Sequence, residues 1–147
     1  MLTERLSLAL SGGDLILPAT GRIAVFAPRA GTDLTILPQD RVQVITGFKP
    51  DHDAFTAAQY ACARQPEGSY AAALVCLPRA KAQGRALLAQ ACAVVGTGGL
   101  IIVDGQKTDG IESMLRDLRG QGVQPSVLSK AHGKIIWFDA RPMPADW

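Results

Sequence analysis

The sequence predicts an α/β protein built on a mostly parallel sheet, and three observations carry that prediction. Leu100–Val103 is an unbroken aliphatic run between turn signals, which suits a strand covered by helices on both faces. Similar short strands alternate with helical patterns along most of the chain. The last two predicted strands are joined by residues 129–133, which are too few for anything but an antiparallel return. We therefore expect a parallel sheet that ends in an antiparallel hairpin.

The composition is that of one folded domain of ordinary size. The chain has 147 residues, of which 48% are apolar, enough to build a real core. A net charge of +2 is too small to indicate a nucleic-acid partner by itself, although it leaves room for a local basic patch. Glu4 and Arg5 precede only a short apolar segment, so we expect neither a signal peptide nor a membrane partner.

The cysteines indicate a reducing compartment. Cys62, Cys76 and Cys92 are an odd number, lack C-x-x-C spacing and sit among aliphatic neighbours. We expect buried, reduced thiols in a cytoplasmic protein, and regard a disulfide or a zinc site as the weaker alternative.

Residues 1–21 are predicted to form an N-terminal β-hairpin packed on the core. Leucines alternate with small residues on either side of Ser11–Asp14, whose glycines suit a turn with positive φ. The alternating leucines are Leu6, Leu8, Leu10, Leu15 and Leu17.

The remaining elements follow from hydrophobic periodicity. Strands are predicted at 22–27, 41–46, 70–77, 100–103, 124–128 and 134–138. Prolines and glycines between the first two strands leave room for a turn or two of helix at most. Three helices are predicted. The first begins at Asp51 and buries Phe55, Ala58 and Cys62, and the second spans residues 81–95. The third has a buried face formed by Ile111, Met114, Leu115 and Leu118. Residues 104–110 are predicted to be a polar loop.

Two short motifs each admit a structural and a functional interpretation. Gly96–Gly99 follows a helix and precedes a strand, which favours a helix end over a cofactor loop, because a phosphate-binding loop follows a strand and opens a helix. Asp51, His52 and Asp53 could be taken for metal ligands. Consecutive helical residues point in different directions, which favours capping of the helix by Asp51.

At three places the chain resembles the N-terminal, methyltransferase-like half of two-domain ribosomal RNA guanine-N2 methyltransferases. These are Leu77–Lys81, Gly98–Ile111 and Ser129–His132, in that order and spacing. Thr108 departs from the pattern, since an arginine is common there in the family. The resemblance implies a three-layer, Rossmann-like class I methyltransferase fold, of which a C-terminal antiparallel hairpin is typical.

The resemblance also implies a domain organisation and partners. Residues 22–140 would be a degenerate methyltransferase-like domain and residues 141–147 a linker to a catalytic "methyltransferase small" domain in the same chain. S-adenosylmethionine would bind to that catalytic domain, and ribosomal RNA is the candidate partner of the half described here.

Three features argue against a methyl-donor site in this half. Pro28 stands in the turn after the first strand, where bare glycine backbone would meet the cofactor. Lys49 offers donors, but no acceptor for the ribose hydroxyls, after the second strand. Leu77–Ala80 keeps one proline of the Asn/Asp-Pro-Pro-aromatic motif of amine methylation. We expect no catalytic residue, cofactor ligand or metal ligand here, and no activity of this domain alone.

Cations replace the missing cofactor groups near the strand ends. They could hold RNA phosphates independently of base sequence, or they could be an ordinary solvated surface, and the sequence favours neither. The candidates are Arg29, Lys49, Arg79, Lys81, Lys107, Lys130 and Lys134. The sequence does not fix which end of the sheet carries the last two. Phe48 is the one aromatic residue in these loops, so base-specific recognition is not expected. His132 could donate to a phosphate but more simply has no chemical role in its turn.

Two other functions stay open. The domain could bind S-adenosylmethionine or another nucleotide through an atypical pocket. Alternatively, it could be an interaction module that pairs through its apolar surface and does not contact RNA.

Overall fold

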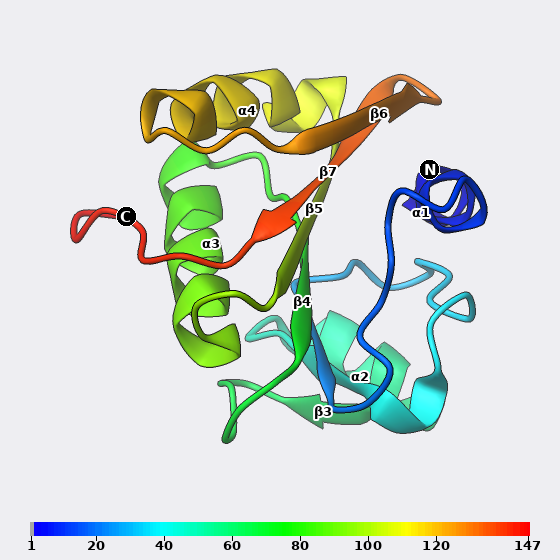
Figure 1. Cartoon of the computed structure of the whole chain (residues 1–147). Helices are drawn as coiled ribbons and strands as arrows, with labels where there is room; N and C mark the ends of the chain where they lie inside the picture. The colour runs from blue at the N-terminus through cyan, green and yellow to red at the C-terminus, as the bar shows by residue number, and fades with distance from the viewer. Residues whose placement is uncertain (1) are drawn as a thin grey trace.

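The computed structural model describes residues 2–147 and contains a seven-stranded, mostly parallel sheet (Figure 1). Met1, the first residue of the predicted N-terminal hairpin, lies outside the described residues. The strand order is β3-β2-β1-β4-β5-β7-β6, and β7 runs antiparallel to both of its neighbours. The strands are β1 (Ile23–Phe26), β2 (Val42–Ile45), β3 (Ala61–Ala63), β4 (Ala72–Cys76), β5 (Leu100–Gln106), β6 (Ser126–Lys130) and β7 (Gly133–Asp139). The predicted fold class and C-terminal hairpin are confirmed.

Helices cover both faces of the sheet and make three layers (Figure 1). Helices α3 (Lys81–Val95) and α4 (Ile111–Gly120) pack on one face, against a core that includes Phe26 of β1. Helices α1 (Leu2–Ser11) and α2 (Lys49–Ala57) pack on the other, against a core that includes Val25. Because side chains alternate along a strand, each central strand supplies residues to both cores. This explains why the central strands read as unbroken apolar runs.

The predicted N-terminal β-hairpin is wrong, because residues 2–11 form helix α1. Leu2, Leu6 and Ala9 lie on one helical face and are buried, whereas Leu8 is 42% exposed. The alternating leucines also satisfied a helical spacing, and packing against β6 and β7 decides in favour of the helix. The segment still covers the core, as expected.

Helix α2 begins two residues before the predicted start. Phe48 is its N-cap residue and makes no side-chain capping bond, so the prediction that Asp51 caps the helix is wrong. Phe55 is buried as predicted, but Ala58 is exposed and Cys62 lies in β3. The sequence analysis missed this three-residue edge strand because it is short and alanine-rich, without the pattern of a buried strand.

The central stretch follows the prediction more closely. Helix α3 has the predicted bounds, and Gly96 ends it with a φ of +83°. Strand β5 continues to Gln106, so the predicted polar loop from residue 104 is wrong up to that point. Asp104 is buried in the sheet rather than solvated in a loop. A 3₁₀ turn, η2 (Lys107–Asp109), connects β5 to α4.

The connections near the termini complete the fold. A single 3₁₀ turn, η1 (Gln39–Arg41), lies between β1 and β2, within the predicted limit of a turn or two of helix. The predicted linker folds back, with Met143 and Trp147 packed on the core beside α3. Within residues 2–147, no helix is long and apolar enough to cross a membrane, and no cluster of three metal-ligating side chains occurs.

Candidate functional site

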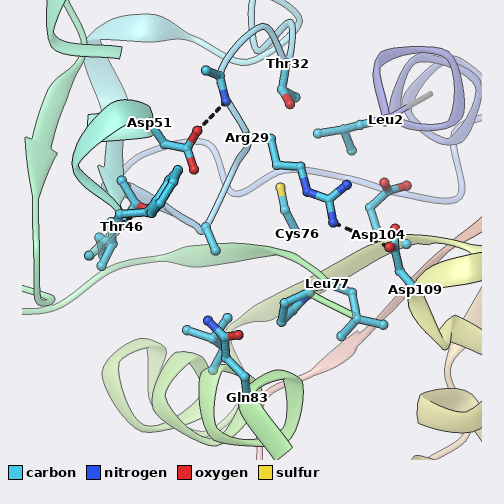
Figure 2. Close-up of a pocket in the computed structure, with 18 of the residues that line it drawn as sticks. Leu2, Arg29, Thr32, Thr46, Asp51, Cys76, Leu77, Gln83, Asp104 and Asp109 are labelled. Atoms are coloured by element: carbon cyan, nitrogen blue, oxygen red, sulfur yellow. Dashed lines mark hydrogen bonds and ion pairs between the residues drawn. The ribbon is translucent and has the colours of Figure 1, made fainter. Parts of the chain in front are cut away.

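A cavity of about 670 Å³ opens where β1 to β5 end, at the edge that we call the C-terminal rim. Open parallel sheets bind ligands at this edge. Its walls come from the loops after the strands and from α1, α2 and α3 (Figure 2). The lining residues used below are Arg5, Ala27, Arg29, Ala30, Phe48, Asp51, Cys76, Asp104 and Asp109.

The turn after β1 is closed by the protein's own groups. The backbone N–H of Ala30 donates to Oδ1 of Asp51 at 2.8 Å, so an α2 carboxylate takes one amide that a ligand could use (Figure 2). Ala27 has a φ of +56°, a conformation that favours glycine, and Pro28 has no N–H to offer. No helix starts between β1 and η1, so this turn lacks the positive helix end that attracts anions in nucleotide sites.

Two arginines of the rim share one carboxylate. Arg29 Nη2 lies 3.5 Å from Asp109 Oδ1, and Arg79 Nε lies 4.0 Å from the same oxygen. Asp109 is buried, and Oδ2 also accepts the backbone N–H of Gln106 at 3.2 Å. Figure 2 shows Arg29 extending toward Asp109. The single negative charge of Asp109 therefore balances one of these two positive charges.

The loop after β2 presents an aromatic ring rather than an acid. Phe48 is 63% exposed and lines the cavity. Lys49 points elsewhere, since it lies outside the cavity lining and its Nζ contacts Asp53 Oδ2 at 2.9 Å.

A buried ion pair forms the floor of the cavity beside β5. Arg5 of α1 donates from Nε to Asp104 Oδ1 at 2.6 Å and from Nη2 to Asp104 Oδ2 at 2.9 Å. Burial, and then the Asp104 carboxylate, raise the pKa of the nearby Cys76 thiol far above its ordinary value, although Arg29 lowers it in part. Cys76 therefore stays protonated at neutral pH and is a poor nucleophile.

A second cleft of about 320 Å³ lies at the same rim, and we call it the hairpin cleft. Strand pairing of Gln106 with Gly133 places the β6–β7 turn beside the end of β5, which settles the position of Lys130 and Lys134. The cleft is lined by Lys107, Ile111, Glu112, Ser129, Lys130, Ala131, His132, Gly133 and Lys134.

The seven candidate cations do not converge on one point. Arg29 lines the large cavity, and Arg79 and Lys81 line a small pocket beside α4. Lys107, Lys130 and Lys134 line the hairpin cleft, whereas Lys49 lines neither that cleft nor the large cavity. Whether any of them contacts RNA remains a prediction.

The sequence analysis missed the carboxylates that organise the rim. It predicts a capping role for Asp51 and a polar loop for Asp104 and Asp109. Arg5 and Asp104 are 99 residues apart, so no local spacing signals their contact. Asp109 precedes a glycine and a helical stripe, which is a turn signal but not a signal of burial.

No protein-family model matches the chain, and its sequence matches no curated protein. Solved structures do match its fold. The T. thermophilus 16S rRNA N2 G1207 methyltransferase RsmC, solved with AdoMet and guanosine, matches with a TM-score of 0.69 and 19% identity over 90% of this chain. This chain spans 39% of that protein.

Two other solved structures are similar over nearly the whole chain. The ribosomal protein L11 methylase of Lactobacillus delbrueckii subsp. bulgaricus has a TM-score of 0.66 and 13% identity, with 95% of this chain and 80% of that one covered. The N-methyltransferase NodS of Bradyrhizobium japonicum has a TM-score of 0.64 and 11% identity, and the match covers 96% of this chain and 94% of NodS. These similarities show that the chain has the Rossmann-like methyltransferase fold.

Proposed function

We propose that this chain is a non-catalytic methyltransferase-like domain of an S-adenosylmethionine-dependent rRNA (guanine-N2) methyltransferase in the cytoplasm. In this proposal it supports a catalytic domain of the same parent protein and holds RNA through phosphate contacts. The fold supports the first part, since it resembles methyltransferases that include an rRNA guanine-N2 enzyme.

The bond from the Ala30 N–H to Asp51 is the observation that carries the absence of catalysis. A methyl-donor site in this fold needs the turn after β1 to approach the ligand with unpaired amides. Here the turn bears a proline and an amide bonded to Asp51, and no helix follows it. Arg29 and Asp109 both line the cavity and lie 3.5 Å apart, Nη2 to Oδ1. The residues present do not fit S-adenosylmethionine in the orientation that the fold uses, and no methyl-transfer step is assigned to them.

One observation favours the rival function, binding of a nucleotide through an atypical pocket. The cavity volume of about 670 Å³ lies within the range of small-molecule sites, roughly 300–1,000 Å³. Phe48 is placed at its edge, where a ring could stack on a base.

Calorimetric titration of the protein with S-adenosylmethionine up to millimolar concentration separates the two functions. The proposal predicts no saturable heat. Saturable binding that Phe48→Ala abolishes would establish the rival and overturn the assignment. Arg116→Ala, an exposed change on α4 away from the cavity lining, is the control for non-specific effects.

The RNA and partner roles have their own tests. Filter binding to a structured rRNA fragment should show affinity at 50 mM salt that falls steeply by 200 mM, because binding by phosphate contacts releases counterions. Undetectable binding at 50 mM would remove the RNA role. Sedimentation with a separately expressed catalytic domain of the parent protein should show a complex, and two independent boundaries would contradict the supporting role.

A further inference from the structure

We propose that the hairpin cleft binds the RNA backbone and that Lys107 and Lys130 are the cations that contact its phosphates. This inference rests on the RNA role proposed above and narrows seven candidate cations to two residues. In this inference the RNA backbone contacts the hairpin cleft rather than the large cavity.

The other candidates already have carboxylate partners within this chain. Arg29 and Arg79 share Asp109, as described above. Lys49 lies 2.9 Å from Asp53, and Lys81 lies 3.3 Å from Asp117. Lys134 has a more distant carboxylate partner: its Nζ lies 3.9 Å from Glu112 Oε1 and donates a hydrogen bond to Ser129 Oγ at 2.8 Å. A cation beside a carboxylate attracts a phosphate less, because the two opposite charges largely cancel at the distance of a ligand.

Lys107 and Lys130 differ from the rest of the set. Both side chains are exposed, and neither has a carboxylate oxygen within 4.0 Å in the part of the chain that the structure describes. Both line the same cleft, one from the β5 end and one from the β6 end. Two uncompensated cations that face one hollow are the arrangement that a phosphate favours.

The turn that carries Lys130 is held in place from two sides. The Lys107 N–H donates to the His132 carbonyl at 2.9 Å. Arg5 Nη1 donates to the carbonyls of Lys130 and Ala131 at 3.1 and 3.3 Å. Ala131 and His132 have φ values of +53° and +59°, as in the tight hairpin turns that match the twist of a sheet. A turn that is ordered before binding loses less entropy when a ligand arrives.

The lining of the cleft also indicates which part of RNA it would contact. It contains three lysines, the Ser129 hydroxyl and the His132 imidazole, and no Phe, Tyr or Trp side chain. Glu112 lies at its margin and opposes a phosphate, and Lys134 balances it in part. We therefore expect the cleft to contact the backbone with little dependence on base sequence.

Two double variants of equal charge test the inference by filter binding to a 20-nucleotide rRNA hairpin in 50–200 mM KCl. Lys107→Ala with Lys130→Ala removes the cleft cations, and Lys49→Ala with Lys81→Ala removes two paired lysines. The cleft variant should bind the hairpin about 10-fold more weakly than wild type at 50 mM KCl. Its plot of log K against log salt should be less steep by about 1.5, because each lost phosphate contact reduces the magnitude of the slope by roughly 0.7–0.9. The control should change less than about 2-fold. A base-scrambled hairpin should bind the wild type equally well.

Equal weakening by the two double variants would overturn the inference and leave the RNA role standing, because it would mean a diffuse positive surface. Failure of the wild type to bind at 50 mM KCl would overturn the RNA role itself. Glu112→Gln gives an independent readout if the cleft variant folds poorly. It should bind RNA about 2- to 5-fold more tightly, since a negative charge at the cleft is removed, and unchanged affinity would contradict the inference.

Discussion

At the scale of single residues, Arg5 connects three segments that are distant in sequence. It lies on α1, pairs with Asp104 on β5 and donates to two carbonyls of the β6–β7 turn. The guanidinium is almost wholly buried, with 1% of its residue surface exposed. A buried charge is tolerated in this way when its hydrogen bonds are satisfied, as they are here.

Arg5→Met should lower the free energy of unfolding by about 3–5 kcal/mol, because it leaves the Asp104 carboxylate buried without a counter-charge. Urea denaturation followed by circular dichroism measures the loss. Adding Asp104→Leu should recover most of it, since two apolar side chains can replace a buried pair at little cost. Arg119→Met, an exposed change on α4, should stay within about 0.5 kcal/mol of wild type. A stable single variant would show that the pair does not hold the rim together.

At the scale of elements, the pairing of β5 and β7 depends on a close approach of two backbones. A Cβ atom at Gly133 would lie 2.5 Å from the Gly105 carbonyl oxygen and 2.6 Å from Arg5 Nη1. Contacts this short require movement of the backbone or of the buried arginine. Gly133 is therefore the position at which the hairpin tolerates no side chain.

Gly133→Ala should destabilise the protein by about 1–3 kcal/mol, the usual cost of overpacking. Gly120→Ala is the matched control, because a Cβ at Gly120 meets nothing within 4 Å. The control should be neutral or more stable by about 0.4–1 kcal/mol through a less flexible unfolded chain. Thermal unfolding of the two variants compares them directly, and a Gly133 variant as stable as the Gly120 variant would contradict the close packing.

Helices α3 and α4 are joined by ion pairs around Asp117. Its Oδ2 lies 2.8 Å from Arg85 Nη2 and 3.3 Å from Lys81 Nζ. Partial burial raises the pKa of Asp117, but the hydrogen bonds and charges of Arg85 and Lys81 outweigh it and leave the pKa below its ordinary value. The folded protein therefore favours the ionised carboxylate.

Asp117→Asn should cost about 1 kcal/mol of stability at pH 7, and the cost should shrink in acid. A lowered folded pKa contributes stability above the unfolded pKa near 4, and that stability is lost as the pH falls through the folded pKa. Urea denaturation of both proteins from pH 7 to pH 2 checks this. A difference that stays constant below pH 4 would show that the carboxylate charge is not responsible.

The elements that the sequence predicted well are those whose burial leaves a periodic signal. The spacing of apolar residues correctly predicted burial of Leu88 and Ala91 in α3. It also predicted that residues 101–103 of β5 are buried within the sheet. Helix α1 and strand β3 were missed for opposite reasons. The leucines of α1 fit two periods at once, and β3 is an edge strand with almost no apolar pattern.

At the scale of the whole molecule, the chain has a methyltransferase fold in which internal hydrogen bonds and ion pairs occupy several polar groups of the C-terminal rim. Asp51 binds the turn after β1, Asp109 holds two arginines, and Arg5 with Asp104 fills the end of β5. Lys107 and Lys130, which have no carboxylate partner among the described residues, line the hairpin cleft at the same rim.

The sequence could predict the rim itself and its cations, because residues that follow parallel strands meet at one edge. It could not predict which cations are neutralised. That depends on carboxylates brought in from distant segments, such as Asp109 beside Arg29 and Asp117 beside Lys81. Such contacts follow from the packing of the completed fold and leave no local pattern.

Backbone amide NMR of this 15.5 kDa chain tests the central claim most directly. The protein is titrated in one experiment with S-adenosylmethionine and in another with the rRNA hairpin. The account predicts that the cofactor leaves the amides of Ala30 and Gly31 unshifted, and that RNA shifts the amides of residue 107 and of residues 130–134. Saturable shifts of Ala30 and Gly31 with S-adenosylmethionine would contradict the first prediction, and the absence of any response of the hairpin cleft to RNA would contradict the second.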